Sequence, residues 1–224
     1  MLYRLTKSKF ILGIQCEKAL YLDVYKPNLA WYSHETLKRF RKGRDFEYNV
    51  KALFPNAIDI SSILGRRIEK YPELTIESLK THGEVTLYEA GFVYNQVLIL
   101  ADVVHKNSDG NISVYEIKNS LSVKEVFRQD INLQYYIISH CLDRLSSFSI
   151  IYNDGNDNPV YEELTSDAIK AEELIAKQIE RFHDVLQGIE PTISTGEHCS
   201  TPYDCPYRRY CEGTVSAQLD LGLT

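Results

Sequence analysis

The sequence predicts an α/β protein whose centre is a mixed β-sheet. Segments with the apolar spacing of helices lie towards both ends of the chain, and segments rich in Val, Ile, Leu and Tyr lie between them. This order of elements places helices against a sheet. The 224 residues allow one domain, and 44% hydrophobic with 25% charged residues excludes collagen-like, disordered and disulfide-scaffold proteins.

Two helices are expected before the sheet, over residues 5–25 and 34–54. Their apolar residues recur mostly at helical spacing. Pro27 ends the first helix and Pro55 ends the second, because proline cannot continue a helix. A shorter helix is expected near residues 76–82.

The sheet is expected to begin as a three-strand antiparallel meander, because turn-forming Asn, Asp and Gly residues separate three apolar segments. These strands cover residues 85–94, 97–105 and 112–118. A helix, two further strands, a long helix and an aperiodic tail should follow, over residues 123–145, 147–152, 160–164, 166–187 and from 192 onward.

Two acidic residues and a lysine in this meander are candidates for a metal site. Alternation along a strand places Glu116 and Lys118 on one face, and the short connection 106–111 makes the strand of Asp102 its neighbour. Converging oxygen ligands suit Mg²⁺ or Mn²⁺, and a nearby lysine can orient water or stabilise a phosphoryl oxyanion. A surface hairpin with ordinary charges is the alternative, but the apolar segment 97–101 is typical of a buried strand.

These residues also carry a resemblance to a known family. Asp102, Glu116-Ile117-Lys118 and Gln134 followed by Tyr135 and Tyr136 occur in the order seen in PD-(D/E)XK nucleases, and the chain resembles their RecB-like branch. The resemblance implies a restriction-endonuclease-like core over 84–190 within a single nuclease domain, 1–224. The branch usually spaces its helix motif as Q-x-x-x-Y, whereas the fourth residue after Gln134 is Ile138.

The resemblance further implies which residues form the site. Glu47, Asp102 and Glu116 would bind Mg²⁺ or Mn²⁺, with the carbonyl of Ile117 as a further ligand. Glu47 follows Gly43 where the branch keeps a G-x-x-x-(H/E) element, and Glu89 and His34 are the alternatives for this ligand. Lys118 would position the attacking water, and Gln134 with Tyr135 or Tyr136 would orient the substrate or the lysine.

Three of the five cysteines gather in the tail. Cys199, Cys205 and Cys211 have the spacing C-x5-C-x5-C, which lacks the short knuckles of zinc ribbons. A fourth thiolate would come from Cys16 or Cys141, and Cys141 lies in an apolar run typical of a core thiol. Zinc is one metal that such a set of thiolates can bind.

The RecB-like branch favours a different metal group. Its iron–sulfur members, among them CRISPR-adaptation nucleases and AddB-type helicase–nucleases, take one cysteine from before the core and three from after it. The resemblance implies a 4Fe–4S cluster on Cys16, Cys199, Cys205 and Cys211. The helical N-terminal segment, residues 1–55, and the tail, residues 192–213, would form this iron–sulfur subdomain, in which the cluster acts as a crosslink.

The net charge of −6 does not itself suggest nucleic-acid binding. Positive charge is nevertheless concentrated in Lys38–Arg44, with smaller clusters at Arg66-Arg67 and Arg208-Arg209, so local contacts to phosphates are expected. Solvated helix faces are the alternative for each cluster. No apolar stretch is long enough to span a membrane, and residues 1–10 lack the apolar region of a signal peptide, which favours the cytoplasm.

The expected function is that of a Mg²⁺- or Mn²⁺-dependent DNA nuclease, and the resemblance implies an exonuclease that acts on single-stranded ends. By resemblance its setting is CRISPR spacer acquisition or DNA repair, with a CRISPR integrase or a helicase as candidate partners. A non-catalytic iron–sulfur module that binds DNA ends or a partner protein is the alternative. A nuclease lobe of a longer chain is a third interpretation.

Overall fold

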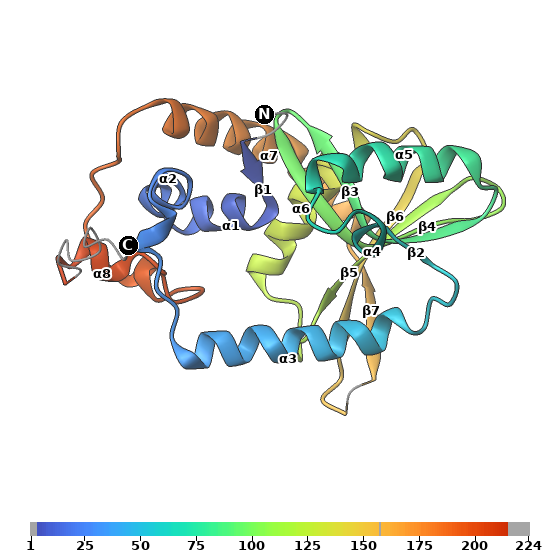
Figure 1. Cartoon of the computed structure of the whole chain (residues 1–224), viewed down its shortest axis with the longest axis horizontal. Helices are drawn as coiled ribbons and strands as arrows, with labels where there is room; N and C mark the ends of the chain where they lie inside the picture. Colours follow the sequence, from blue (N-terminus) through green and yellow to red (C-terminus); the bar gives the residue numbers. More distant parts are fainter. Residues whose placement is uncertain (1–3, 157, 215–224) are drawn as a thin grey trace, which may run out of the picture. The chain divides into compact units, whose positions relative to one another are not determined.

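The computed structural model describes residues 4–156 and 158–214 (Figure 1). The chain divides into two compact units: the first contains residues up to Lys7 and Lys38–Gln178, and the second contains Ser8–Leu37 and the chain from Ile179. Helices α3 (His34–Lys51) and α7 (Thr165–Gln187) each contribute to both units. Segments that are far apart in the sequence therefore share the second unit.

The first unit is built on the mixed sheet that the sequence predicts. Its strand order is β2-β3-β4-β5-β6-β7, and β1 pairs with β4 beside this path. The antiparallel meander β3-β4-β5 is confirmed, β5 and β6 are parallel, and β6 and β7 are antiparallel. The strands are β1 (Leu5–Thr6), β2 (Ile58–Asp59), β3 (Val85–Tyr94), β4 (Val97–Lys106), β5 (Ile112–Lys118), β6 (Leu145–Asn153) and β7 (Pro159–Glu163).

Strand β4 pairs with different neighbours at its two ends. The start of β4 pairs with β1 through Leu5↔Val97, whereas its pairing with β5 begins only at Val103↔Tyr115. Asp102 lies where these partners diverge. It is thus in the middle of β4, which runs on to Lys106.

Helices α3 and α6 (Glu125–Ser139) lie against opposite faces of this sheet. Phe46 and Val50 of α3 form a buried cluster with Ile117 of β5. Glu116 points away from that cluster, as alternation along a strand requires, and bonds to Gln134 of α6. The two faces therefore supply different parts of the candidate site.

Several predicted helices change their bounds. The helix expected over 123–145 ends at Ser139, because the chain must turn before β6 begins at Leu145. The short helix near 76–82 is α5 (Tyr71–Thr81), which starts earlier since Pro72 suits a first helical turn. Helix α4 (Ile60–Leu64) and the 3-10 turn η2 (Ile68–Lys70) complete this unit.

The second unit breaks the helix expected over 5–25. Helix α1 (Lys7–Gln15) ends where Cys16 adopts an extended backbone with φ −164° and ψ 117°, and α2 (Glu17–Tyr25) begins after it. The edge of the Phe10 ring meets Phe182 of α7 with centroids 5.3 Å apart. The tail, expected to be aperiodic, contains two short helical elements, η3 (Glu197–Cys199) and α8 (Arg208–Cys211). The 3-10 turn η1 (Pro27–Leu29) connects α2 to the segment before α3.

The helices of the described residues, 4–156 and 158–214, include none that is long and apolar enough to cross a membrane.

Candidate functional site

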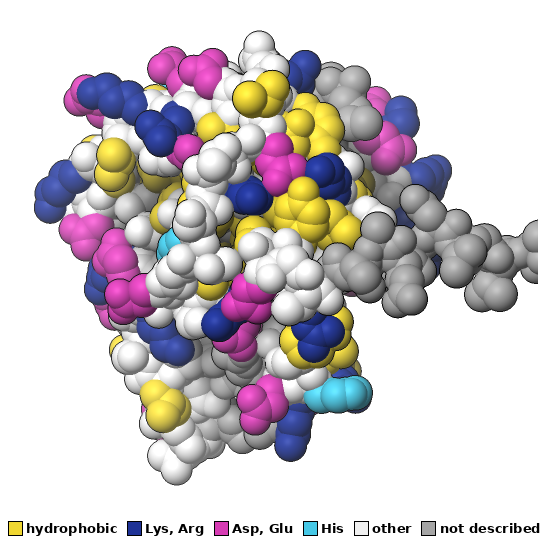
Figure 2. All heavy atoms as spheres, turned by 90° about the vertical axis from the view of Figure 1, so that its left-hand side faces the viewer, with side chains coloured by type: hydrophobic (Ala, Val, Ile, Leu, Met, Phe, Trp, Pro, Cys, Tyr) yellow, Lys and Arg dark blue, Asp and Glu magenta, His cyan; other side chains and the backbone are white. Residues whose placement is uncertain are grey.

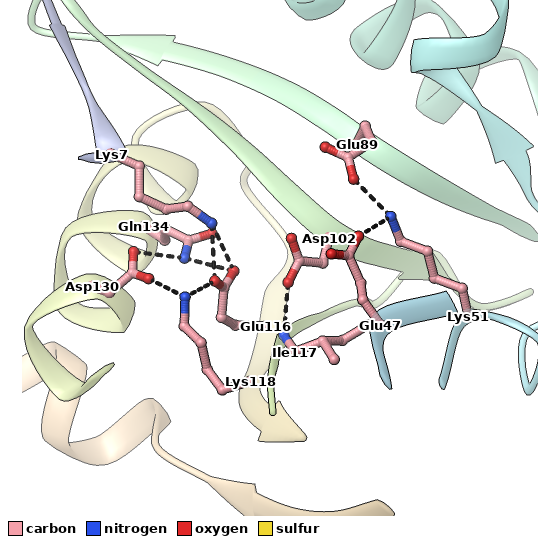
Figure 3. A network of polar contacts seen from close by, with 10 residues as sticks. All are labelled: Lys7, Glu47, Lys51, Glu89, Asp102, Glu116, Ile117, Lys118, Asp130 and Gln134. Carbon is pink, nitrogen blue, oxygen red and sulfur yellow. Dashed lines mark hydrogen bonds and ion pairs between the residues drawn. The ribbon is translucent and has the colours of Figure 1, made fainter. Parts of the chain in front are cut away.

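Three carboxylates from three elements converge in the first unit. Glu47 of α3, Glu89 of β3 and Asp102 of β4 place one ligand atom each within 4.8 Å of one another, and all three are half-buried (Figure 3). The sequence indicated Glu47 for the third ligand and Glu89 as its alternative. The structure brings both to Asp102.

The backbone at Glu89 explains how its carboxylate reaches this group. Glu89 has a positive φ of 52°, a conformation that costs a non-glycine residue about 1 kcal/mol or more. Pairing between β3 and β4 is regular on both sides, at Tyr88↔Val103 and Ala90↔Ala101, and is interrupted at Glu89. Such local strain re-aims a side chain, and it is common at functional sites.

A lysine already lies among these acids. The ammonium of Lys51 is 2.6 Å from Glu47 Oε1 and 2.6 Å from Glu89 Oε1. Burial lowers the pKa of Lys51, but the two carboxylates outweigh this effect and raise the pKa above its usual range. Lys51 therefore supplies one positive charge at the point where the three carboxylates meet.

A second network lies on the other side of β5. Lys118 Nζ is 2.5 Å from Glu116 Oε1 and 2.7 Å from Asp130 Oδ2, so Glu116 and Lys118 share a face as predicted. Lys7 donates to both oxygens of Glu116, at 2.9 and 3.1 Å. Glu116 is almost fully buried, and two ammonium groups compensate its charge.

Charge compensation sets the ionisation of this network. Burial would raise the pKa of Glu116, but the Lys118 and Lys7 charges and the bond from Gln134 hold it well below its usual range. Burial would likewise lower the pKa values of Lys118 and Lys7. The surrounding carboxylates instead raise both, so both lysines stay protonated.

Asp102 has the opposite environment. Burial first, and then the charge of Glu116, raises the pKa of Asp102 to about 8. Its Oδ2 accepts a hydrogen bond from the Ile117 N–H at 2.7 Å, which fixes the carboxyl in the gap between β4 and β5. An acid in such surroundings gains from a nearby cation.

Gln134 contacts the acids of the second network. Its amide nitrogen donates to Glu116 Oε2 at 2.8 Å and to Asp130 Oδ1 at 3.1 Å, while its Oε1 is buried without a hydrogen-bond partner. The ring of Tyr136 lies instead against Tyr94 and His140, with centroids 5.7 and 4.6 Å away. Gln134 is thus placed at the site, whereas the Tyr136 ring belongs to an aromatic cluster.

Some predicted residues lie apart or cannot be placed. His34 starts α3 in the second unit. The basic segment Lys38–Arg44 lies in α3, where Lys38 and Arg41 are exposed and the other basic side chains fall outside the described ones. Arg66 and Arg67 are exposed in the first unit.

The basic pair in the tail has partners already. Arg208 pairs with Glu212 at 2.7 Å, and the Arg209 guanidinium lies 3.4 Å from the ring centroid of Trp31. Figure 2 shows basic and acidic side chains interspersed on one face, with hydrophobic ones between them. The described side chains of that face therefore do not form a single basic field.

The four cysteines predicted to act together all lie in the second unit. All are free, and Cys199 is buried. Burial raises the pKa of the Cys205 thiol to about 11, and the charges of Cys16, Cys199 and Cys211 contribute to this shift. Among residues 4–156 and 158–214, the one group of three close metal-ligand atoms contains no cysteine, so the structure does not itself show a cysteine cluster. Cys141 lies in the first unit, and its thiol donates to the Val93 carbonyl.

Polar contacts tie the tail to α1 and α2 within this unit. The Gln15 amide, one residue before Cys16, donates to the carbonyls of His198 at 2.6 Å and Tyr203 at 2.7 Å. Tyr207 is fully buried, and its hydroxyl donates to Asp23 at 2.9 Å. The loop between Cys199 and Cys205 is therefore held beside the segment that carries Cys16.

Sequence reasoning missed three residues that contact the site: Lys7, Lys51 and Asp130. Lys51 follows Glu47 by four residues, and Asp130 precedes Gln134 by four, so helical spacing could have found both. Lys7 reaches Glu116 through the pairing of β1 with β4. No local pattern in the sequence predicts that contact.

Comparisons with known proteins do not assign the chain to a family. No protein-family model and no curated protein matches it. A crystal structure of SSO0001 covers 95% of this chain and 87% of its own, at 13% sequence identity and a TM-score of 0.45. A likeness of that degree leaves the function to the site itself.

Proposed function

We propose that this chain is a metal-dependent nuclease of the PD-(D/E)XK kind that hydrolyses phosphodiester bonds in DNA. One observation supports this most directly. The carboxylates of Glu47, Glu89 and Asp102 converge within 4.8 Å, and the neighbouring strand β5 carries Glu116 and the protonated Lys118. Acids that can hold a hard cation, next to a fixed ammonium group, suit phosphoryl transfer.

The residues present fit Mg²⁺ or Mn²⁺. Every donor in the convergent group is a carboxylate oxygen, the ligand type that these ions prefer. Across both networks five carboxylates face three lysines, which leaves two negative charges when all groups are ionised (Figure 3). One divalent cation would offset this excess. When bound, such an ion activates water and neutralises charge on phosphate oxygens.

The protein's own residues would act around that ion. The carboxylates of Asp130 and Glu116 raise the pKa of Lys118 and hold its side chain as an ammonium group between them. Lys118 would orient the attacking water or stabilise negative charge on the phosphoryl oxygens. Glu116 lies outside the convergent group of Glu47, Glu89 and Asp102, and its Oε2 accepts a hydrogen bond from Gln134; its role as a metal ligand stays a prediction of the resemblance. The carbonyl of Ile117 and the Tyr136 hydroxyl stay predictions as a ligand and an orienting group.

The substrate and setting rest on the family resemblance. We infer an exonuclease that acts on single-stranded DNA ends, in CRISPR spacer acquisition or in DNA repair. The exposed Lys38 and Arg41 of α3 would meet phosphates, in which case binding should weaken as salt rises.

Cleavage of end-labelled single strands tests this proposal. Asp102→Ala and Lys118→Ala should each lower Mn²⁺-dependent cleavage by about 100-fold or more, because each removes a group that acts on the reacting phosphate. Lys177→Ala is the matched control, since Lys177 is an exposed lysine of α7. Cleavage that survives both site substitutions would contradict the proposal.

We further propose that Cys16, Cys199, Cys205 and Cys211 hold a 4Fe–4S cluster. All four are free and belong to the same compact unit, and Gln15, next to Cys16, bonds to the loop between Cys199 and Cys205, which supports a shared role for them. The choice of an iron–sulfur cluster over zinc rests on the family resemblance, in which one cysteine comes before the core and three come after it.

Anaerobic purification followed by visible spectroscopy and iron and zinc analysis tests the cluster. We expect visible absorption and iron rather than zinc. A cluster-loaded protein without cleavage under Mg²⁺ or Mn²⁺ would favour the non-catalytic module that binds DNA ends or a partner protein.

A further inference from the structure

Four buried or half-buried side chains close a ring of hydrogen bonds between β5 and α6. Lys118 lies between Glu116 Oε1 and Asp130 Oδ2, at 2.5 and 2.7 Å. Gln134 joins the remaining oxygens of the same two acids, Glu116 Oε2 and Asp130 Oδ1, at 2.8 and 3.1 Å. Each carboxylate thus accepts from Lys118 on one oxygen and from the Gln134 amide on the other, and both oxygens of Glu116 also accept from Lys7 (Figure 3).

Asp130 is the member of this ring without an assigned role. It lies one helical turn before Gln134, so α6 presents both side chains to β5 together. Asp130 is only 5% exposed, and a carboxylate in that position is costly unless it is paired. Its placement against Lys118 is therefore a specific arrangement and not a solvated surface charge.

Asp130 also changes where the Lys118 charge can lie. Glu116 is two residues from Lys118 on the same strand face and could draw the ammonium entirely onto itself. A second acid on the helix side pulls in another direction, which holds the ammonium between β5 and α6. The amide of Gln134 fixes both acids, so neither carboxylate can rotate alone.

We propose that Asp130 is a positioning residue for the reaction: it holds the Lys118 ammonium in the place from which it acts on water or on the phosphoryl group. This inference rests on the proposed nuclease function. Asp130 itself lies behind Lys118 and does not belong to the convergent group of Glu47, Glu89 and Asp102.

The first test is kinetic. Asp130→Asn keeps the side-chain shape but removes the charge, and should lower kcat by about 100-fold with KM changed less than about twofold, since small misplacements of a reacting group cost this much. Asp130→Glu should recover part of the rate. Glu125→Gln, an exposed acid in the first turn of α6, should leave both constants unchanged.

A double-mutant cycle separates positioning from a general structural role. In a Lys118→Ala background Asp130→Asn should have no further effect on kcat, because the group that Asp130 holds is already gone. If the two substitutions together lowered kcat by the product of their separate factors, the proposal would be overturned. An unchanged kcat in a folded Asp130→Asn protein would overturn it too.

A readout without catalysis keeps the inference distinct from the proposed function. Lys118 should be acylated several times faster by a succinimidyl ester in Asp130→Asn than in the wild type, with Lys177 as the internal reference and peptide mass spectrometry as the measurement. Faster labelling of the variant, alongside a wild type that cleaves no DNA, would refute the nuclease and keep the positioning role. Unchanged labelling would refute the positioning role, whatever the activity.

Discussion

Asp102 must satisfy two opposing demands. Burial and the nearby Glu116 charge favour its neutral form and raise its pKa to about 8, whereas the proposed function needs it ionised as a ligand. Its bond from the Ile117 N–H keeps it in place in either form. The residue therefore makes the metal-free protein less stable at high pH, and a bound cation would remove that penalty.

This conflict gives a prediction for Asp102→Asn. The folded-state pKa of Asp102, about 8, lies above its unfolded value of about 3.9. Between these values the native state keeps a proton that the unfolded state has lost, so the free energy of unfolding falls as pH rises. Asparagine does not ionise and escapes this fall. In EDTA the variant should be the more stable protein at pH about 8 but not at pH about 4.

Urea denaturation of both proteins across that pH range measures the difference. Since every other titrating group is common to the two proteins, their difference isolates Asp102. If the free energies of unfolding of the two proteins changed with pH in the same way, the pKa of Asp102 would not be raised in the folded protein. The same variant should gain little thermal stability from Mn²⁺, whereas the wild type should gain more.

At the scale of elements, the ammonium group of Lys51 links α3 to β3. Lys51 bridges Glu47 of its own helix, four residues away, to Glu89 of the strand. The lysine side chain is 16% exposed, so its charge is only partly screened. Lys51 thereby joins the two elements while no metal compensates their acids.

Lys51→Met should therefore destabilise the metal-free protein by about 1–3 kcal/mol, because the neighbouring carboxylates would lose their positive partner. Added Mn²⁺ should restore more stability to this variant than to the wild type. Lys177→Met is the control: it removes a similar pair with Glu173, but at 69% exposure, and should cost less than about 0.5 kcal/mol. Chemical denaturation in EDTA and in Mn²⁺ measures both, and equal losses would contradict the bridge.

The elements also show how far the sequence determines the site. The strands of Asp102 and Glu116 could be predicted, because apolar alternation and turn residues are local signals. Glu89 could be proposed only as an alternative, since no local pattern in the sequence predicts its positive φ or the interruption of β3–β4 pairing there. Lys7 could not be foreseen, because β1 pairs with β4 across some ninety residues of sequence.

At the scale of the whole molecule, one unit is assembled from two segments that are far apart in the sequence. The second unit joins Ser8–Leu37 to the chain from Ile179, and Gln15 and Tyr207 supply its polar ties. A contact of such sequence separation requires a long loop to close, which costs conformational entropy. A metal group that links Cys16 to the tail would offset some of that cost.

Cys205→Ser should thus abolish visible absorption and lower the hydrogen-exchange protection of α1, α2 and the tail more than that of β3, β4 and β5. The reason is that the crosslink would lie wholly within the second unit, whereas the sheet has its own core. Cys141→Ser is the matched control, because Cys141 lies in the first unit and bonds to Val93. It should keep the absorption. Equal loss of protection in the two variants would contradict the crosslink. If wild-type protein instead holds no cluster while its second unit is fully protected, buried aromatic packing such as Phe10 on Phe182 suffices to hold the unit together.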